Sequence, residues 1–172
     1  NAMASELLFR KVIFPDHLPY SLYLHPMPGQ YEDMSSFVSG LEKRNIRTII
    51  CLTSCDEIAR FSPEYLVYVK DETRRCAIEW FPISDFGIPE DTNACVDLAR
   101  KYAQHLREGE AILVHCRMGI GRTGLFAIVL LMALGIPRIE AEQIIRNAHA
   151  AVQTRAQIEL IRWAEHILQN SS

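Results

Sequence analysis

The stretch HCRMGIGRTG, residues 115–124, decides the fold of this chain. It follows the apolar run AILV (111–114) and leads into a second apolar run, GLFAIVLLMAL (124–134). The short run is typical of a buried strand and the longer one of a buried helix. Three glycines between them permit unusual backbone dihedrals and close packing. The stretch therefore predicts a strand, a tight loop carrying one cysteine and two arginines, and a helix.

Strand and helix patterns alternate along the rest of the chain. We expect strands at 21–25, 47–52, 76–83 and 111–115. We expect helices at 34–41, 95–106, 123–134, 138–149 and 154–168, and a helical start to the segment SPEYLVYVKDETRR (62–75). The predicted fold class is α/β, a central, mainly parallel sheet flanked by helices. Its CX5R loop lies between the last buried strand and a helix, at the sheet edge where ligands bind.

Length and composition indicate one soluble globular domain. The chain has 172 residues, of which 49% are hydrophobic and 23% charged, with a net charge of −3. This charge argues against nucleic acid or an anionic membrane as a partner. The longest apolar stretch, 125–136, is too short to span a bilayer, and the N-terminus lacks the apolar core of a secretion signal. Five cysteines, an odd number, suggest a reducing compartment.

These features predict a cytoplasmic, monomeric protein with a single domain over residues 3–172. Asn1 and Ala2, which precede Met3, look like a remnant of an expression vector. We find no zinc, calcium or paired-carboxylate spacing and expect neither a metal nor a cofactor. His25, His105, His149 and His166 are scattered, and we interpret them as surface or helix-face residues rather than ligands.

The glycine loop has the composition of an anion-binding site with a nucleophile. Successive backbone N–H groups in such a loop can point inward, and the following helix adds the positive end of its dipole. Arg122 offers a planar fork to two oxygens of a tetrahedral anion. These groups favour the thiolate of Cys116, which makes it a nucleophile. A lone strand-end cysteine is usually a core residue, and the glycines alone match a nucleotide loop weakly, without the Walker lysine.

The same stretch resembles the HCxxGxxR[S/T] signature of the cysteine-dependent protein tyrosine phosphatases, especially the compact dual-specificity-like members. The resemblance implies catalysis through a phosphocysteine, with Cys116 as nucleophile and Arg122 as phosphate binder. It also implies that Thr123 bonds the Cys116 sulfur and that His115 holds the loop. A general base is the alternative role for a histidine beside the nucleophile. The backbone amides that would bind phosphate are those of Arg117, Met118, Gly119, Ile120, Gly121 and Arg122. The Arg117 side chain should point to the pocket rim, where it would favour acidic substrates or remain solvated.

The segment FPISDFGIPED (81–91) supplies a candidate general acid, because an alkoxide leaves poorly without a proton. Asp85 follows a predicted strand, and Gly87 and Pro89 suit a movable loop. The segment resembles the general-acid loop of the same phosphatase family. An ordinary turn aspartate is the alternative. Asp91, the competing carboxylate, is better explained as a helix start.

The segment AVQTRAQIELIRW (151–163) resembles the Q-T-x-x-Q segment of tyrosine phosphatases. The resemblance implies that Gln153 positions the hydrolytic water and that Gln157 supports it at the substrate site. The alternative is that both glutamines are solvated cap or polar-face residues. Glu57 is a candidate partner for Arg122, as a glutamate is in relatives, although its register in CLTSCDEI (51–58) is open.

The predicted function is hydrolysis of phosphomonoesters, on phosphotyrosine and also phosphoserine or phosphothreonine of proteins, or on small phosphomonoesters. No aromatic recognition loop precedes 21–25, which favours a shallow pocket. The alternatives are a lipid or inositol-phosphate phosphatase, a catalytically silent phosphoryl-binding module, and a sulfur-transfer or arsenate-reducing enzyme. The resemblance also suggests that Cys116 forms a redox disulfide with Cys51 or Cys55. The alternative is that Cys51 is an inert, buried core residue.

Overall fold

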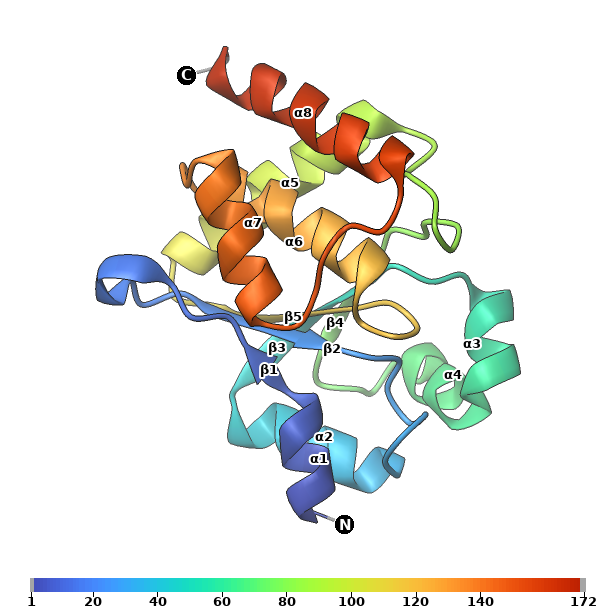
Figure 1. Ribbon diagram of the computed structural model, residues 1–172. Helices are drawn as coiled ribbons and strands as arrows, with labels where there is room; N and C mark the ends of the chain where they lie inside the picture. Colours follow the sequence, from blue (N-terminus) through green and yellow to red (C-terminus); the bar gives the residue numbers. More distant parts are fainter. Residues whose placement is uncertain (1, 171–172) are drawn as a thin grey trace.

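A five-stranded sheet forms the centre of the computed structural model, which describes residues 2–170 (Figure 1). The strand order is β1–β2–β5–β3–β4. Strands β2, β5, β3 and β4 are mutually parallel, and β1 is antiparallel to β2. The prediction of a mainly parallel sheet is therefore confirmed. The strands are β1 (Arg10–Lys11), β2 (Ser21–His25), β3 (Ile46–Cys51), β4 (Ala77–Trp80) and β5 (Ala111–His115).

Helices cover both faces of this sheet (Figure 1). One face carries α1 (Ala2–Leu8), α2 (Met34–Lys43), α3 (Cys55–Phe61) and α4 (Pro63–Lys70). The other carries α5 (Thr92–Arg107), α6 (Gly121–Ala133), α7 (Arg138–Asn147) and α8 (Arg155–Gln169). A short 3-10 helix, η1 (Pro15–His17), precedes β2. Each face has its own apolar core, and the helix α6 is buried on nearly its whole circumference. This is why its sequence is apolar without a polar stripe.

The structure differs from the predicted elements in the length of one strand and in several elements that were not predicted. The strand expected at 76–83 ends at Trp80, since Pro82 has no N–H for the sheet, although Phe81 and Ile83 still donate to the carbonyls of Cys51 and Leu52. The elements α1, β1, η1 and α3 were not expected. Of the two residues assigned to a vector remnant, Asn1 lies outside the described residues and Ala2 begins α1.

Side-chain caps fix the starts of four helices. Asp33, Ser54, Asp91 and Thr154 each accept a hydrogen bond from the backbone N–H three residues ahead. The cap at Asp91 confirms the interpretation of that residue as a helix start. Within residues 2–170, no helix combines the length and apolarity that a membrane crossing requires.

Candidate active site

Cys116 lies immediately after β5, at the carboxyl end of the central strand, with 2% of its surface exposed. Its sulfur accepts two hydrogen bonds, from the Gly119 N–H at 3.2 Å and from the Thr123 hydroxyl at 3.0 Å. Both donors favour a negative charge on the sulfur. Helix α6 begins at Gly121, so its positive end points at the same loop. The cysteine therefore lies where two hydrogen-bond donors and the positive end of a helix converge.

Two glycines make this loop possible. Gly119 has a φ of 74°, in the left-handed region that non-glycine residues rarely adopt. Gly124 packs against the backbone of Ala151, where a Cβ atom would lie 2.7 Å from the Ala151 nitrogen. This close approach brings the segment before α8 against the start of α6. The Ala151 N–H then donates to the Ile120 carbonyl at 3.2 Å.

The Arg122 side chain is 2% exposed and is held by Glu57 in a bidentate pair, with both nitrogen–oxygen distances at 2.8 Å. Nη1 also donates to the Ile83 carbonyl at 2.9 Å. Burial disfavours the charge, but the hydrogen bond to Glu57 and the charges of Cys116, Glu57 and Asp85 outweigh it and raise the pKa of Arg122. The Nε atom is buried and has no hydrogen-bond partner among residues 2–170. That donor is the one left for an anion.

His115 is buried beneath the loop. Its Nδ1 donates to the Cys116 carbonyl at 3.0 Å, and its Nε2 accepts from the Tyr65 hydroxyl at 2.7 Å. Burial lowers the pKa of His115 to about 4, so the ring is neutral at pH 7. Both nitrogens of this neutral ring are bonded, so the ring connects the end of β5 to α4. Sequence reasoning did not identify Tyr65, which comes from α4.

Asp85 lies on the loop after β4, and its carboxylate is 3.4 Å from Arg122 Nη2. The side chain is 48% exposed, so the same carboxylate faces solvent. The turn that carries it closes with a hydrogen bond from the Gly87 N–H to the Ser84 carbonyl at 2.8 Å. Phe86 occupies that turn with a φ of 63°, which is strained for a residue with a large side chain. The loop thus brings a carboxylate next to the arginine.

The two glutamines before and in α8 lie at this site in different ways. The Gln153 amide lies so close to Gly121 that a Cβ atom there would collide with it. Gln157 is buried, and its side-chain oxygen accepts from the Gln153 N–H at 2.8 Å. Its side-chain nitrogen donates to the Gly87 carbonyl at 3.1 Å. Gln157 therefore connects the Asp85 loop to the Gln153 backbone instead of facing the opening.

Comparison with known families matches residues 19–167 to a family described as Swiss Army Knife protein, DSP-PTPase phosphatase domain. The chain belongs to this phosphatase family. Three solved structures have a similar fold. A kinase-associated phosphatase with its catalytic cysteine replaced by serine is 22% identical over 88% of this chain and 89% of its own, with a TM-score of 0.74. Tk-PTP in its active form is 22% identical over 92% of this chain and 97% of its own, with a TM-score of 0.71. PTPMT1 in complex with PI(5)P is 17% identical over 87% of this chain and 92% of its own, with a TM-score of 0.66.

The rim of the phosphatase site combines aromatic and cationic side chains. The Arg117 guanidinium lies 3.7 Å from the centre of the Phe61 ring, and that of Arg60 lies 5.1 Å from it. On another part of the rim, the Tyr31 hydroxyl lies 3.4 Å from the sulfur of Met118. Both of these side chains are about half exposed, at 50% and 49%. Tyr31 follows β2, so the sequence analysis, which considered aromatic residues before 21–25, did not find it.

The other thiols of the phosphatase domain are placed differently from Cys116. Cys51 is in register with His115 and belongs to the core on the α2–α4 face, whereas Cys116 belongs to the core on the α5–α8 face. Burial raises the pKa of Cys51 to about 11. Cys55 is exposed at the start of α3. This arrangement supports the interpretation of Cys51 as an inert core residue.

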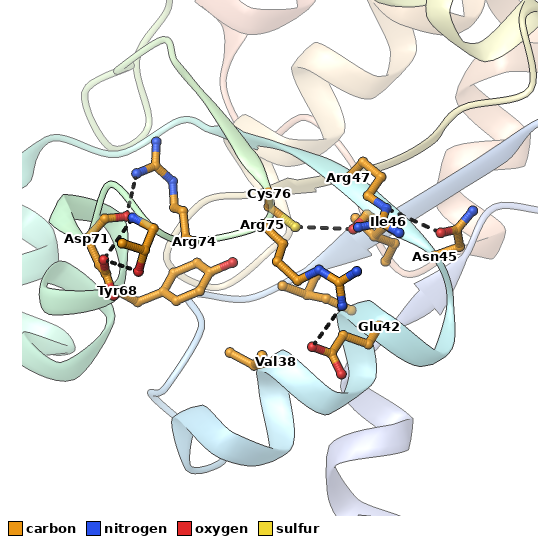
Figure 2. Close-up of a pocket in the computed structure, with 12 residues that line it drawn as sticks. Val38, Glu42, Asn45, Ile46, Arg47, Tyr68, Asp71, Arg74, Arg75 and Cys76 are labelled. Carbon is orange, nitrogen blue, oxygen red and sulfur yellow. Dashed lines mark hydrogen bonds and ion pairs between the residues drawn. The ribbon is translucent and has the colours of Figure 1, made fainter.

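A separate cavity of about 300 Å³ opens near the start of β3, away from the phosphatase loop (Figure 2). Tyr68, Arg75 and Cys76 line it, and Arg75 crosses it towards Glu42 at 3.6 Å. The thiol of Cys76 donates to the Ile46 carbonyl at 3.1 Å. Because the cavity contains neither Cys116 nor Arg122, it is not part of the candidate active site.

Proposed function

We propose that this domain hydrolyses phosphomonoesters, with Cys116 as the nucleophile. The observation that carries the proposal is the Cys116 sulfur, which accepts bonds from Gly119 and Thr123 below an arginine with a free, buried Nε. The thiolate attacks phosphorus, a sulfur–phosphorus bond forms, and the bond to the leaving oxygen breaks. Arg122 and the loop amides stabilise the charge that develops on the phosphoryl oxygens.

Asp85 is the proposed general acid of this first step. Its carboxylic acid form gives its proton to the leaving oxygen, which departs as a neutral alcohol or phenol. The 3.4 Å approach to Arg122 and the access to solvent support this role. Asp91 is occupied as the cap of α5 and does not compete.

Water completes the cycle in the second step. Asp85, now a carboxylate, accepts a proton from the water that attacks the phosphocysteine, and Cys116 leaves as a thiolate. The Thr123 hydroxyl stabilises the departing sulfur through the bond it already makes at 3.0 Å. Gln153, which lies against Gly121, is the proposed water-positioning residue, and Gln157 keeps it in place from behind.

The proposed substrates are phosphorylated proteins, carrying phosphotyrosine and also phosphoserine or phosphothreonine. The half-exposed Tyr31 and the Phe61 ring at the rim support contact with an aromatic ring or a peptide. Arg60 and Arg117 support acidic or additional phosphate groups near the scissile one. The second candidate is a lipid or inositol phosphate, which the fold shared with PTPMT1 in its PI(5)P complex supports.

Turnover of an aryl phosphate, followed by a panel of phosphopeptides and inositol phosphates, tests the proposal. Cys116→Ser should abolish turnover and retain anion binding, because a hydroxyl replaces the thiolate while the amides and Arg122 remain. Cys55→Ser, which changes an exposed thiol, is the matched control and should keep wild-type rates. Turnover by Cys116→Ser would exclude the covalent mechanism. A folded wild type that binds phosphate without turnover would be the silent binding module.

A further inference from the structure

Arg10 connects the phosphatase loop to the end of α7. Strand β1 pairs with β2 at the edge of the sheet, with Arg10 opposite Leu24. The guanidinium donates through Nη2 to the Gly119 carbonyl at 2.6 Å. Through Nη1 it donates to the carbonyls of Ala148 and His149, both at 2.9 Å. One side chain from the N-terminal strand therefore binds three carbonyls of two distant segments.

The bond to Gly119 fixes the orientation of a loop peptide. The carbonyl and the following N–H of a trans peptide point in opposite directions. Holding the Gly119 carbonyl on the outer side thus directs the Ile120 N–H to the inner side, where the anion would bind. The Gly119 N–H is itself bonded to the Cys116 sulfur at 3.2 Å.

The contact between Arg10 and the loop is direct. A Cβ atom at Gly119 would collide with the Arg10 Nη2 and would lie 2.8 Å from the His25 carbonyl oxygen. A second bond holds the same outer side, because the Met27 N–H donates to the Arg117 carbonyl at 2.9 Å. The carbonyls of two loop residues are therefore occupied by donors behind the loop.

No carboxylate among residues 2–170 pairs with the charge of Arg10. Among residues 2–170, its polar contacts are the three carbonyls, and it forms no ion pair. Burial lowers the pKa of Arg10, while the charge of Cys116 acts in the opposite direction. This partly buried guanidinium is therefore held by the three carbonyls alone.

We propose that Arg10 is a positioning residue for the phosphate loop. It holds the Gly119 peptide so that the loop amides face the anion. The proposal rests on the proposed function of this loop as a phosphate cradle.

Arg10→Met tests the proposal without requiring turnover. The first readout is the rate of Cys116 alkylation by iodoacetamide as a function of pH, followed on the Cys116 peptide. The second is the binding of inorganic tungstate by calorimetry. We expect alkylation at about pH 6 to slow roughly tenfold, since the Gly119 N–H is no longer held against the sulfur, and tungstate affinity to fall roughly tenfold, since the loop amides are no longer held in place.

Arg44→Met is the matched control. Arg44 also donates to a backbone carbonyl, that of Gly40 at 3.1 Å, and stacks 4.1 Å from the centre of the Phe9 ring, but it makes no bond to the loop. This variant should lose stability while keeping the wild-type alkylation profile and tungstate affinity. An unchanged profile and affinity in Arg10→Met would overturn the proposal, whatever happens to its melting temperature.

Arg10→Lys keeps the test decisive if Arg10→Met does not fold. An ammonium retains the charge but cannot span three carbonyls with a rigid fork. Tungstate affinity should therefore fall, and wild-type tungstate affinity would overturn the positioning role. The proposed function can fail separately. If Arg10→Met weakens tungstate binding as expected but the wild-type protein hydrolyses no phosphomonoester, the proposed function is contradicted and the role of Arg10 stands.

Discussion

Replacing Glu57 with glutamine tests how Arg122 is held in place. The carboxylate makes two bonds of 2.8 Å to the guanidinium, from side chains that are 18% and 2% exposed. Glutamine keeps the length and shape of the side chain but replaces one acceptor oxygen with an NH2 donor. That donor would face an Arg122 nitrogen that also donates. One of the two bonds is lost, and the other is no longer charge-assisted.

The expected magnitude follows from this geometry. A hydrogen bond to a charged group contributes about 1.5–3 kcal/mol, and removing one partner of a fully buried pair costs about 3–5 kcal/mol. Because Glu57 is partly exposed and glutamine preserves one contact, we expect the free energy of unfolding to fall by about 2 kcal/mol. An arginine displaced by about 1 Å lowers catalysis by up to about 100-fold, so kcat/KM should fall by about 10- to 100-fold.

Steady-state hydrolysis of an aryl phosphate and urea unfolding measure the two effects. Asp56→Asn is the control, since Asp56 is exposed one residue earlier in α3 and should leave both values unchanged. In an Arg122→Lys background, Glu57→Gln should have little further effect on kcat/KM, because the two residues act as a unit. A kcat/KM within about twofold of wild type in the single variant would refute the reasoning.

Three further predictions concern the acid, the buried histidine and the thiols. Asp85→Asn should slow substrates with poor leaving groups most and activated aryl phosphates least, and equal losses across a leaving-group series would assign it a structural role. Burial lowers the pKa of His115 to about 4, so the free energy of unfolding should fall as pH falls from about 6.5 towards 4, by up to about 1.4 kcal/mol per pH unit. In urea unfolding, His115→Asn should show a shallower dependence of stability on pH. After mild peroxide, peptide mapping should find Cys116 oxidised and Cys51 free, since burial raises the pKa of Cys51 to about 11; a peptide linking the two would contradict this.

The parts of the site that are local in sequence were predictable. Cys116, Thr123 and Arg122 lie on one loop and the first turn of one helix, so their spacing alone brings them together. The alternation of apolar strands and helices predicted the sheet because each element carries its own periodicity. The strand predicted at 76–83 was too long. The apolar pattern continues past Pro82, but the hydrogen-bond ladder of the sheet does not, because proline has no N–H to donate.

Glu57 shows where a local signal was available but not used. Ser54 and Glu57 stand three residues apart just after β3, which is the spacing of a capping box. The Ser54 hydroxyl accepts from the Glu57 N–H at 3.2 Å, and this cap fixes Glu57 in the first turn of α3. Since β3 and β5 are parallel neighbours, both elements end at the same edge of the sheet. The capped start of α3 at this edge therefore places Glu57 beside Arg122, which the sequence analysis had left open.

Arg10 and Tyr65 were not predictable in the same way. Arg10 lies 109 residues from Gly119, and Tyr65 lies 50 residues from His115. Nothing in a two-residue strand or in the helix pattern of 63–70 indicates which loop each side chain meets. These contacts depend on the order of strands across the sheet, which periodicity does not determine.

The charges around Cys116 explain why directed donors matter more than net charge at this site. The guanidinium of Arg122 is compensated by Glu57, and the chain as a whole carries −3. Net charge therefore attracts a dianion weakly. What remains for the phosphoryl group are N–H donors with fixed directions: the loop amides and the buried Arg122 Nε. Glu57 orients Arg122, and Arg10 orients the Gly119 peptide. Substituting either residue should therefore lower catalysis more than substituting the rim residues Arg60 or Arg117.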